Sequence, residues 1–220
     1  MKKSLSILVV VALIALATLS LGMRTQTANT GPTPLLPANS LAVPLIAQAT
    51  SYSCGAAALM SVLYYWNAYG GNESGLYSML ETTPKDGTEP IKIVEVAKAH
   101  GLQASMRTNM TVADLRAALG RGETVILALQ AWRDTFDKKW SDTWDSGHYA
   151  VLVAMDAEFA YFMDPSAVAG YAYVPITELL ERWHDYEDRH GVISRYLNLG
   201  ITITGAKNLV TIPGPLVRMD

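Results

Sequence analysis

The chain of 220 residues contains a single cysteine, Cys54, so no disulfide within it can hold the fold together. Stability must therefore come from a buried apolar core, and the residues, half of them hydrophobic, suffice to build one in a domain of ordinary size. The formal charge is only −3, from 17 basic and 20 acidic residues. This balance does not provide the basic face that nucleic-acid binding needs, so we expect no nucleic-acid partner.

The first segment, residues 1–24, predicts export. It begins with Lys2 and Lys3 and continues in an apolar run, LSILVVVALIALATLSLGM. A basic start followed by an apolar run is typical of an export signal. The run is long for a cleaved signal and long enough to span a bilayer, so a cleaved signal peptide and an N-terminal membrane anchor are the two alternatives. Both place the rest of the chain outside the cytoplasm, either secreted or anchored to the membrane.

An exported protein that uses cysteines for stability holds them in pairs, so the unpaired Cys54 has two interpretations. It is either a buried core residue, as free cysteines often are, or a reactive thiol. Cys54 lies where the loop ATSYS meets an apolar, Ala-rich run that predicts a buried helix through Trp66. A helix N-terminus favours the thiolate, which is the nucleophilic form. Gly55, next in the chain, would let another segment or a substrate come close to the sulfur.

The remaining patterns predict an α+β domain over residues 41–205, between a Thr-, Asn- and Pro-rich linker (25–40) and a C-terminal tail (206–220). Apolar residues at helical spacing predict helices at 54–66, 90–101, 111–122 and 175–184. Apolar or alternating runs predict strands at 41–48, 102–108, 124–131, 148–156, 159–166 and 192–204. Residues 132–147 are expected to form a polar loop with three tryptophans.

A thiolate nucleophile needs a base, and the base needs a group that orients it. His148 begins the strand at 148–156, and Asp164 lies at the end of the strand at 159–166, before Pro165. Because the two strands are expected to be antiparallel neighbours, the first residue of one lies near the last residue of the other. This arrangement would put a carboxylate beside an imidazole. The structural alternatives are a half-buried histidine and a turn-forming Asp-Pro pair.

Gln48, shortly before Cys54, is a candidate for a further role. Its side-chain amide could donate a hydrogen bond to an oxyanion, with the Cys54 backbone N–H as the second donor. The stretch HDYEDRH (184–190) has histidines and carboxylates, but its charged surroundings after a helix favour a solvated surface over a metal site. We therefore expect no metal and no cofactor.

Three stretches together resemble a known family: PLIAQATSYSCGAAALMSVLYY, SGHYAVLVAM, and YFMDPS followed by YVPITELLERW. Over residues 41–200 the chain resembles the papain-like cysteine peptidases typified by double-glycine bacteriocin-leader peptidases. The resemblance implies an N-terminal helix that carries the cysteine, packed on an antiparallel sheet that carries the histidine and the aspartate. It maps the family's Gln, Cys, His and Asp onto Gln48, Cys54, His148 and Asp164. It also implies hydrolysis of peptide bonds through a thioester, after a Gly-Gly pair in the best-known members.

The chain departs from those members, which are fused to an ABC transporter and work in the cytoplasm. This sequence shows no transporter region, begins like an exported protein, and has Ser53 where leader-processing members often carry Asp. We therefore expect a standalone, exported cysteine peptidase that acts on a peptide or protein. The alternatives are an amide hydrolase or peptidyl transferase on a cell-wall or small-molecule substrate, and a non-catalytic peptide-binding domain. The substrate and the oligomeric state are left open.

Overall fold

The structure is a computed structural model that describes residues 33–134, 137–167, 169–189, 191–206 and 216–219. The predicted signal peptide or membrane anchor (1–24) and the first part of the predicted linker lie outside the described residues. Within the described ranges, no helix is both long and apolar enough to cross a membrane.

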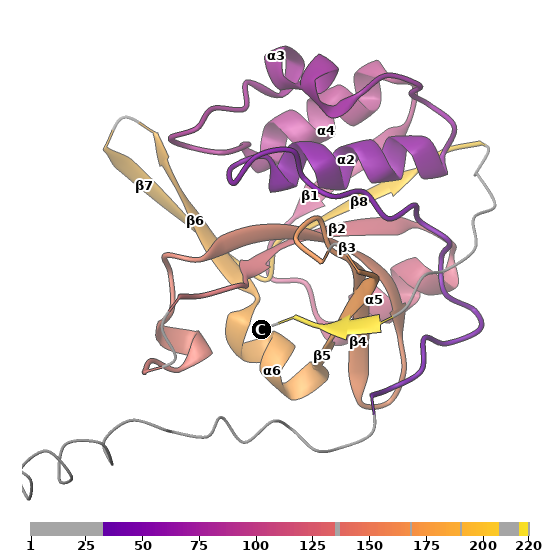
Figure 1. The fold of residues 1–220 in the computed structure, drawn as a ribbon, viewed down its shortest axis with the longest axis vertical. Coiled ribbons are helices and arrows are strands. Elements are labelled where there is room, and N and C mark those ends of the chain that lie inside the picture. Colours follow the sequence, from indigo (N-terminus) through magenta and orange to yellow (C-terminus); the bar gives the residue numbers. More distant parts are fainter. Residues whose placement is uncertain (1–32, 135–136, 168, 190, 207–215, 220) are drawn as a thin grey trace, which may run out of the picture. The chain divides into compact units, whose positions relative to one another are not determined.

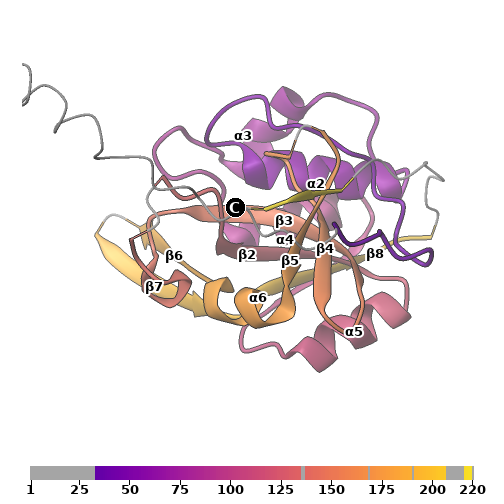
Figure 2. The same ribbon diagram turned by 60° about the horizontal axis from the view of Figure 1, so that its bottom comes forward.

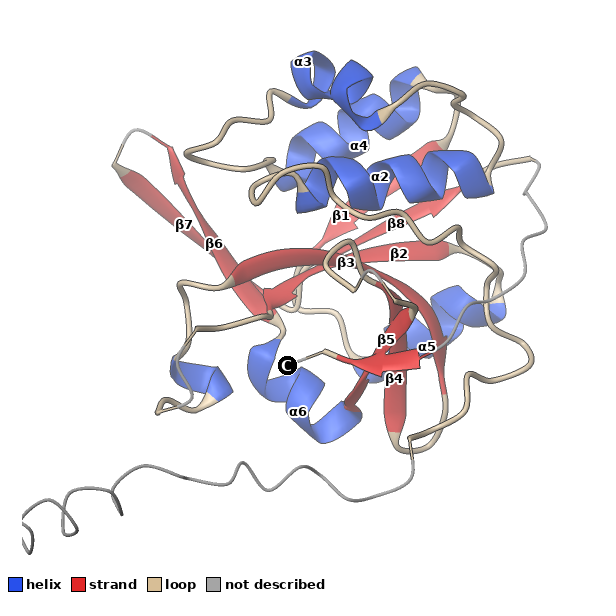
Figure 3. Ribbon diagram, viewed as in Figure 1, coloured by secondary structure: helices blue, strands red, loops and turns tan. Residues whose placement is uncertain are grey.

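A seven-stranded sheet in the order β1-β8-β2-β3-β4-β5-β9 forms the centre of the fold (Figure 1). Its strands are β1 (Gln103–Arg107), β2 (Thr124–Gln130), β3 (Gly147–Met155), β4 (Phe159–Met163), β5 (Tyr171–Pro175), β8 (Gly200–Thr204) and β9 (Leu216–Arg218). Neighbouring strands are antiparallel, except that β9 runs parallel to β5. A separate hairpin of β6 (His184–Arg189) and β7 (Val192–Leu197) extends away from the sheet (Figure 3).

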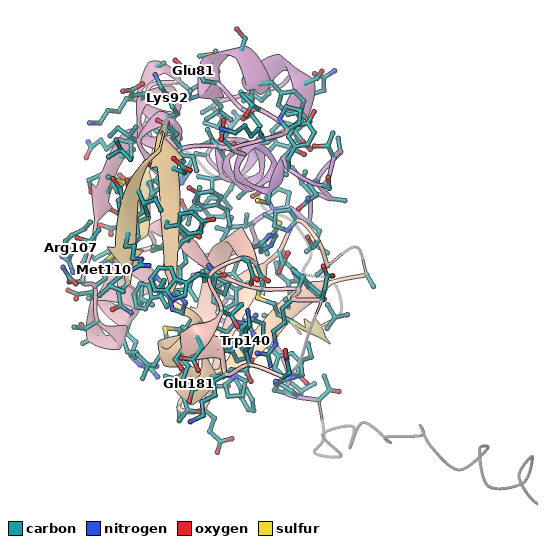
Figure 4. All side chains as sticks on the ribbon, turned by 90° about the vertical axis from the view of Figure 1, so that its left-hand side faces the viewer. Glu81, Lys92, Arg107, Met110, Trp140 and Glu181 are labelled. Carbon is teal, nitrogen blue, oxygen red and sulfur yellow. The ribbon has the colours of Figure 1, made fainter. Side chains whose placement is uncertain are left out.

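Helices cover both faces of this sheet (Figure 2). One face carries α2 (Cys54–Tyr65), η1 (Glu73–Leu76), α3 (Tyr77–Leu80) and α4 (Pro90–Ala99), and the other carries α5 (Val112–Gly120) and α6 (Ile176–Arg182), with η2 (Trp140–Asp142) beside α6. On the first face, Lys92 of α4 forms an ion pair at 2.8 Å with Glu81, the residue after α3 (Figure 4). The helices on the two faces thus bury the sheet between two apolar layers.

The central strands supply side chains to both layers because successive residues of a strand point to opposite faces. In β2, Ile126 and Ala128 belong to the core under α2, whereas Val125, Leu127 and Leu129 belong to the core under α5 and α6. Every residue of β2 is buried, which explains the unbroken apolar run from Val125 to Leu129. The predicted α+β class, with the cysteine helix packed on a mostly antiparallel sheet, is confirmed.

Burial also explains why residues 54–65 form the helix α2. Its sequence, CGAAALMSVLYY, is apolar on all sides, and a helix of that kind is stable only when it is surrounded by protein. Ten of its 12 residues are buried, between the sheet and α4. Its first residue, Cys54, is partly exposed. Burial of the helix body therefore fixes the position of the one residue that lies at its accessible end.

The predicted strand at 41–48 is wrong. The segment contains no strand, and Leu41 N–H donates a backbone hydrogen bond to the Val153 carbonyl of β3 at 2.9 Å. Pro44 has no N–H to donate, so a ladder of hydrogen bonds cannot continue along this segment.

The C-terminal third also differs from the prediction. The single strand region expected at 192–204 is two strands in different sheets, because Asn198, with φ of 49°, turns the chain between β7 and β8. Strand β5 was not predicted, and β9 lies in the segment predicted as a C-terminal tail. Both continue the sheet beyond β4, next to the strands that carry the candidate site.

Candidate active site

Cys54 lines a cleft with a volume of about 310 Å³ at the N-terminus of α2. The buried residue Ser53 stabilises the loop that precedes Cys54. Its hydroxyl accepts a hydrogen bond from the Thr50 N–H at 3.0 Å and donates one to the Thr50 carbonyl at 3.2 Å. The first N–H groups of a helix have no partner within the helix, so the positive end of the helix dipole lies at the thiol.

Of the two neighbours expected at Gly55, another segment of the chain or a substrate, the structure shows the first. A Cβ atom there would lie 2.7 Å from the Cβ of Thr88 and 3.1 Å from Cδ2 of Tyr149. The Tyr149 hydroxyl also donates to the Thr88 carbonyl at 3.0 Å. The space above this glycine is therefore filled by the protein itself, and the glycine lets the loop at 84–90 pack against α2 instead of leaving room for a substrate.

The structure brings His148 and Asp164 together. His148 is the second residue of β3, and Asp164 directly follows the last residue of β4, and these strands are antiparallel with Val151 opposite Met163. His148 Nε2 lies 2.8 Å from Asp164 Oδ1, and both side chains are buried. The side chain of Cys54 also acts on the ionisation of the ring.

The electrostatics of this pair favour an imidazolium beside a carboxylate. Burial disfavours the charged ring, but the charge and hydrogen bond of Asp164, together with those of Cys54, outweigh burial and raise the pKa of His148 to about 10. Burial likewise opposes ionisation of Asp164, yet the His148 cation and several hydrogen-bond donors lower the pKa of this carboxyl overall. The thiol, imidazole and carboxylate therefore form one electrostatically coupled group.

Two donors that the sequence analysis missed complete the surroundings of Asp164. The Ser166 N–H donates to Oδ1 at 2.7 Å, and the Trp132 indole N–H donates to Oδ2 at 3.1 Å. The Ser166 contact follows from local sequence, because an aspartate commonly binds the backbone N–H two residues later in a turn. Trp132 lies two residues after the end of β2 and has a left-handed backbone (φ 54°). No local sequence pattern places it beside Asp164; only the fold does.

Gln48 lies beside the same group and is held by three hydrogen bonds. Its N–H donates to the Pro165 carbonyl at 3.0 Å, its Nε2 donates to the Thr50 carbonyl at 2.6 Å, and its Oε1 accepts from the Ser166 hydroxyl at 3.1 Å. A carbonyl can only accept, so this contact fixes which end of the amide is the nitrogen. The Gln48 amide is therefore held in one orientation.

A buried carboxylate outside the predicted set secures this loop. Glu73 of η1 accepts from the Ala49 N–H at 3.0 Å and from the Tyr77 hydroxyl at 2.7 Å. The segment between Gln48 and Cys54 is therefore tied at both ends, which holds the amide and the thiol in a fixed relation.

The tryptophans of the predicted polar loop anchor it to the fold. The buried ring of Trp140 lies under the guanidinium groups of Arg133 and Arg182, at 4.0 Å and 4.1 Å, and Trp144 packs on His184 with ring centroids 4.2 Å apart. The described part of the loop around Trp140 and Trp144 is therefore held against the fold, and Trp144 lines the cleft.

The solvated surface expected at 184–190 is wrong for the start of that segment, which belongs to β6. His184 is buried, and its Nε2 lies 2.7 Å from the Thr143 carbonyl. In the described part of the chain, no group of three or more His, Cys, Asp or Glu residues is placed to hold a metal ion.

A cysteine at the start of a buried helix, on an antiparallel sheet that carries a histidine and an aspartate, defines the papain-like class of cysteine peptidase folds. Within this class, the chain belongs to the Peptidase_C39 like family, whose model matches residues 40–190. The resemblance inferred from the sequence is thereby confirmed.

Solved structures with the same fold include a double glycine motif protease from an AMS/PCAT transporter in complex with the leader peptide. It is 18% identical with a TM-score of 0.53, and the match covers 76% of this chain and 94% of that one. The peptidase domain of Streptococcus ComA, a bifunctional ABC transporter involved in quorum sensing, is 19% identical with a TM-score of 0.52, covering 74% and 99%. No curated protein sequence matches this chain. Family and fold together support a cysteine peptidase-type function.

Proposed function

We propose that this protein hydrolyses peptide bonds through a thioester intermediate, with Cys54 as the nucleophile and His148 as the general base and acid. In this proposal Asp164 orients the imidazole and stabilises its positive charge, and Gln48 donates a hydrogen bond to the oxyanion. The observation that carries the proposal is the buried His148–Asp164 pair at 2.8 Å, whose imidazole also interacts with Cys54.

In the first half of the reaction, the Cys54 sulfur attacks the carbonyl carbon of the peptide bond. The oxyanion that forms accepts hydrogen bonds from Gln48 Nε2 and the Cys54 backbone N–H. The His148 imidazolium then gives its proton to the leaving amine, the C–N bond breaks, and a thioester remains.

In the second half, the neutral imidazole takes a proton from a water molecule, which attacks the thioester carbonyl. The C–S bond breaks, the acid product leaves, and the thiolate–imidazolium pair is restored. Asp164 keeps the imidazole in one orientation throughout both halves.

A peptide is the proposed occupant of the cleft, in line with the leader peptide bound to one protein of the same fold.

The export-type segment at 1–24 supports a site of action outside the cytoplasm. A fusion of residues 1–40 to alkaline phosphatase, which is active only outside the cytoplasm, tests this part. Activity supports export, and an inactive but stably produced fusion contradicts it.

Digestion of a proteome-derived peptide library by the full chain tests the enzymatic proposal. Mass spectrometry should detect new termini that the parent produces and a folded Cys54→Ala variant does not. The absence of parent-specific termini, or the same termini with Cys54→Ala, would contradict the proposal.

A further inference from the structure

The cleft beside Cys54 is lined by more carboxylates than cations. Among the described residues that line it, only Lys85 is a cation, whereas the carboxylates are Asp86, Glu89, Asp145, Asp185, Glu187 and Asp188. A low-dielectric cleft that is lined by charges of one sign concentrates ligands of the opposite sign. The excess of carboxylates by itself favours a cationic ligand.

Asp185 is the cleft carboxylate that lies against the residue before His148. A Cβ atom on Gly147, the residue before His148, would lie 2.7 Å from Asp185 Oδ1 and 2.9 Å from Oδ2. The glycine therefore opens the space in which this carboxylate sits, and any larger residue would displace it. The charge of His148 also acts on the ionisation of Asp185, which places both in the same electrostatic environment.

The hydrogen bonds of Asp185 are made on one side. Oδ1 accepts from the Tyr186 N–H at 2.9 Å and from Gln130 Nε2 at 3.2 Å. Within the described ranges, Oδ2 has no hydrogen bond and no ion pair, although the side chain lies largely inside the protein and lines the cleft. Asp185 is half-buried and Oδ2 is open to the cleft, so this atom can accept a hydrogen bond from a donor that arrives with the ligand.

The ionisation of Asp185 agrees with this geometry. Burial raises the pKa of Asp185 to about 7, against the effect of its two hydrogen bonds, and the charge of Glu187 acts in the same direction as burial. A bound cation would offset both the burial and the repulsion. The rings of Tyr149, Trp144 and Tyr196 also line the cleft, and aromatic faces attract cations.

We propose that this cleft binds a lysine or arginine side chain of the substrate, within three residues of the cut bond, with Asp185 as its principal partner. The proposal rests on the proposed peptidase function, since it assigns a substrate class to the same site. A peptide with a basic residue places its cation against Asp185 Oδ2 while its backbone lies along the thiol.

The first test compares the parent with Asp185→Asn, which keeps the shape of the side chain and removes its charge. Cuts in a peptide library by the parent should be enriched in Lys or Arg within three residues of the bond. For matched fluorogenic peptides, replacing that residue by norleucine should lower kcat/KM of the parent about tenfold or more, as expected when a charged hydrogen-bond partner is lost. Asp185→Asn should lower kcat/KM for the basic peptide by a similar factor and leave the norleucine peptide within about twofold.

Asp86→Asn is the matched control. It removes the same charge from the same cleft, but Asp86 is exposed and already paired with Lys85 at 3.1 Å, so we expect a change within about twofold for both peptides. Equal loss on basic and norleucine peptides in Asp185→Asn would show that Asp185 acts on the catalytic group instead, and would overturn the proposal.

A second measurement does not depend on turnover. Peptidyl chloromethyl ketones with Lys or norleucine at each of the three positions before the ketone are tested for their rate of labelling Cys54 at pH 8. Faster labelling by one Lys probe, lost in Asp185→Asn, supports the basic subsite even if no library peptide is cut, in which case only the hydrolytic proposal fails. Absence of a Lys preference in both the library and the labelling rates would overturn the inference while leaving peptide hydrolysis intact.

Discussion

Two regions meet at the cleft and are built in opposite ways. The catalytic wall, defined as the proposed catalytic residues Gln48, Cys54, His148 and Asp164, has its cysteine at the start of a buried helix and its histidine and aspartate buried and paired. The cleft rim, defined as the loop at 84–90 and the β6–β7 hairpin, is largely exposed. Packed elements can hold reacting atoms to a few tenths of an ångström, whereas an exposed rim can change without loss of the fold. The comparison predicts that wall variants alter cleavage of every peptide and that rim variants alter only the choice of peptide.

The largest effect is expected for His148→Ala, which should remove nearly all peptide cleavage, because the thiol loses its base and the leaving amine loses its acid. In the parent, kcat/KM should remain high until the pH approaches about 10, where His148 loses its proton, and should fall above it. Asp164→Asn removes the carboxylate that favours the imidazolium, so this alkaline limb should move to lower pH. A limb that stays in place in Asp164→Asn would show that the carboxylate does not act through the ring.

A smaller loss is expected for Gln48→Ala, which should lower kcat by about 100-fold with little change in KM, the usual result of removing one oxyanion donor. Ser166→Ala should lower kcat less, since it releases the Gln48 amide but leaves its N–H groups in place. The two losses should not add in the double variant, because Ser166 acts through Gln48. Steady-state kinetics of the parent, the two single variants and the double variant on one peptide measure these effects. Full activity of Gln48→Ala would show that other groups bind the oxyanion.

The wall and the rim also differ in how far the sequence predicted them. Cys54, His148 and Asp164 lie at the ends of elements with strong signals, a fully apolar helix and two apolar strands, so their positions followed from the elements. Strand β6, HDYEDR, is rich in charged residues and was predicted as a solvated surface, whereas β7 lies within the strand region predicted at 192–204. Trp132 reaches Asp164 only through the path of the chain after β2, which no local pattern encodes. Local signals thus predicted the positions of Cys54, His148 and Asp164 in the fold better than they predicted the cleft rim.

Trp132→Phe should have a modest effect that reports on Asp164. The substitution keeps an aromatic ring and removes the N–H that binds Oδ2, so one buried carboxylate oxygen loses its donor, at a cost of about 1–3 kcal/mol in unfolding free energy. Because this donor helps to lower the pKa of Asp164, the acid limb of kcat/KM should move to higher pH. Denaturant unfolding and a pH–rate profile measure the two effects, and an unchanged acid limb would assign the indole contact to packing alone.

The smallest effect is expected on the outer side of the hairpin. Ile193 of β7 is 59% exposed, so Ile193→Ser should change the free energy of unfolding by no more than about 0.5 kcal/mol and should leave kcat/KM unaltered. Denaturant unfolding and kinetics with a basic peptide provide the check. A large loss of stability there would show that the rim is part of the core, which would break the distinction between the two regions.

The central claim, that Cys54 is a working nucleophile coupled to His148, is tested most directly by the rate at which iodoacetamide labels the folded protein near neutral pH. The chain has no other thiol, so intact mass reports this one site. The account predicts rapid, complete labelling of the parent and much slower labelling of a folded His148→Ala variant, because the imidazolium no longer favours the thiolate. Labelling of the parent only after denaturation, or at the same rate in both proteins, would contradict it.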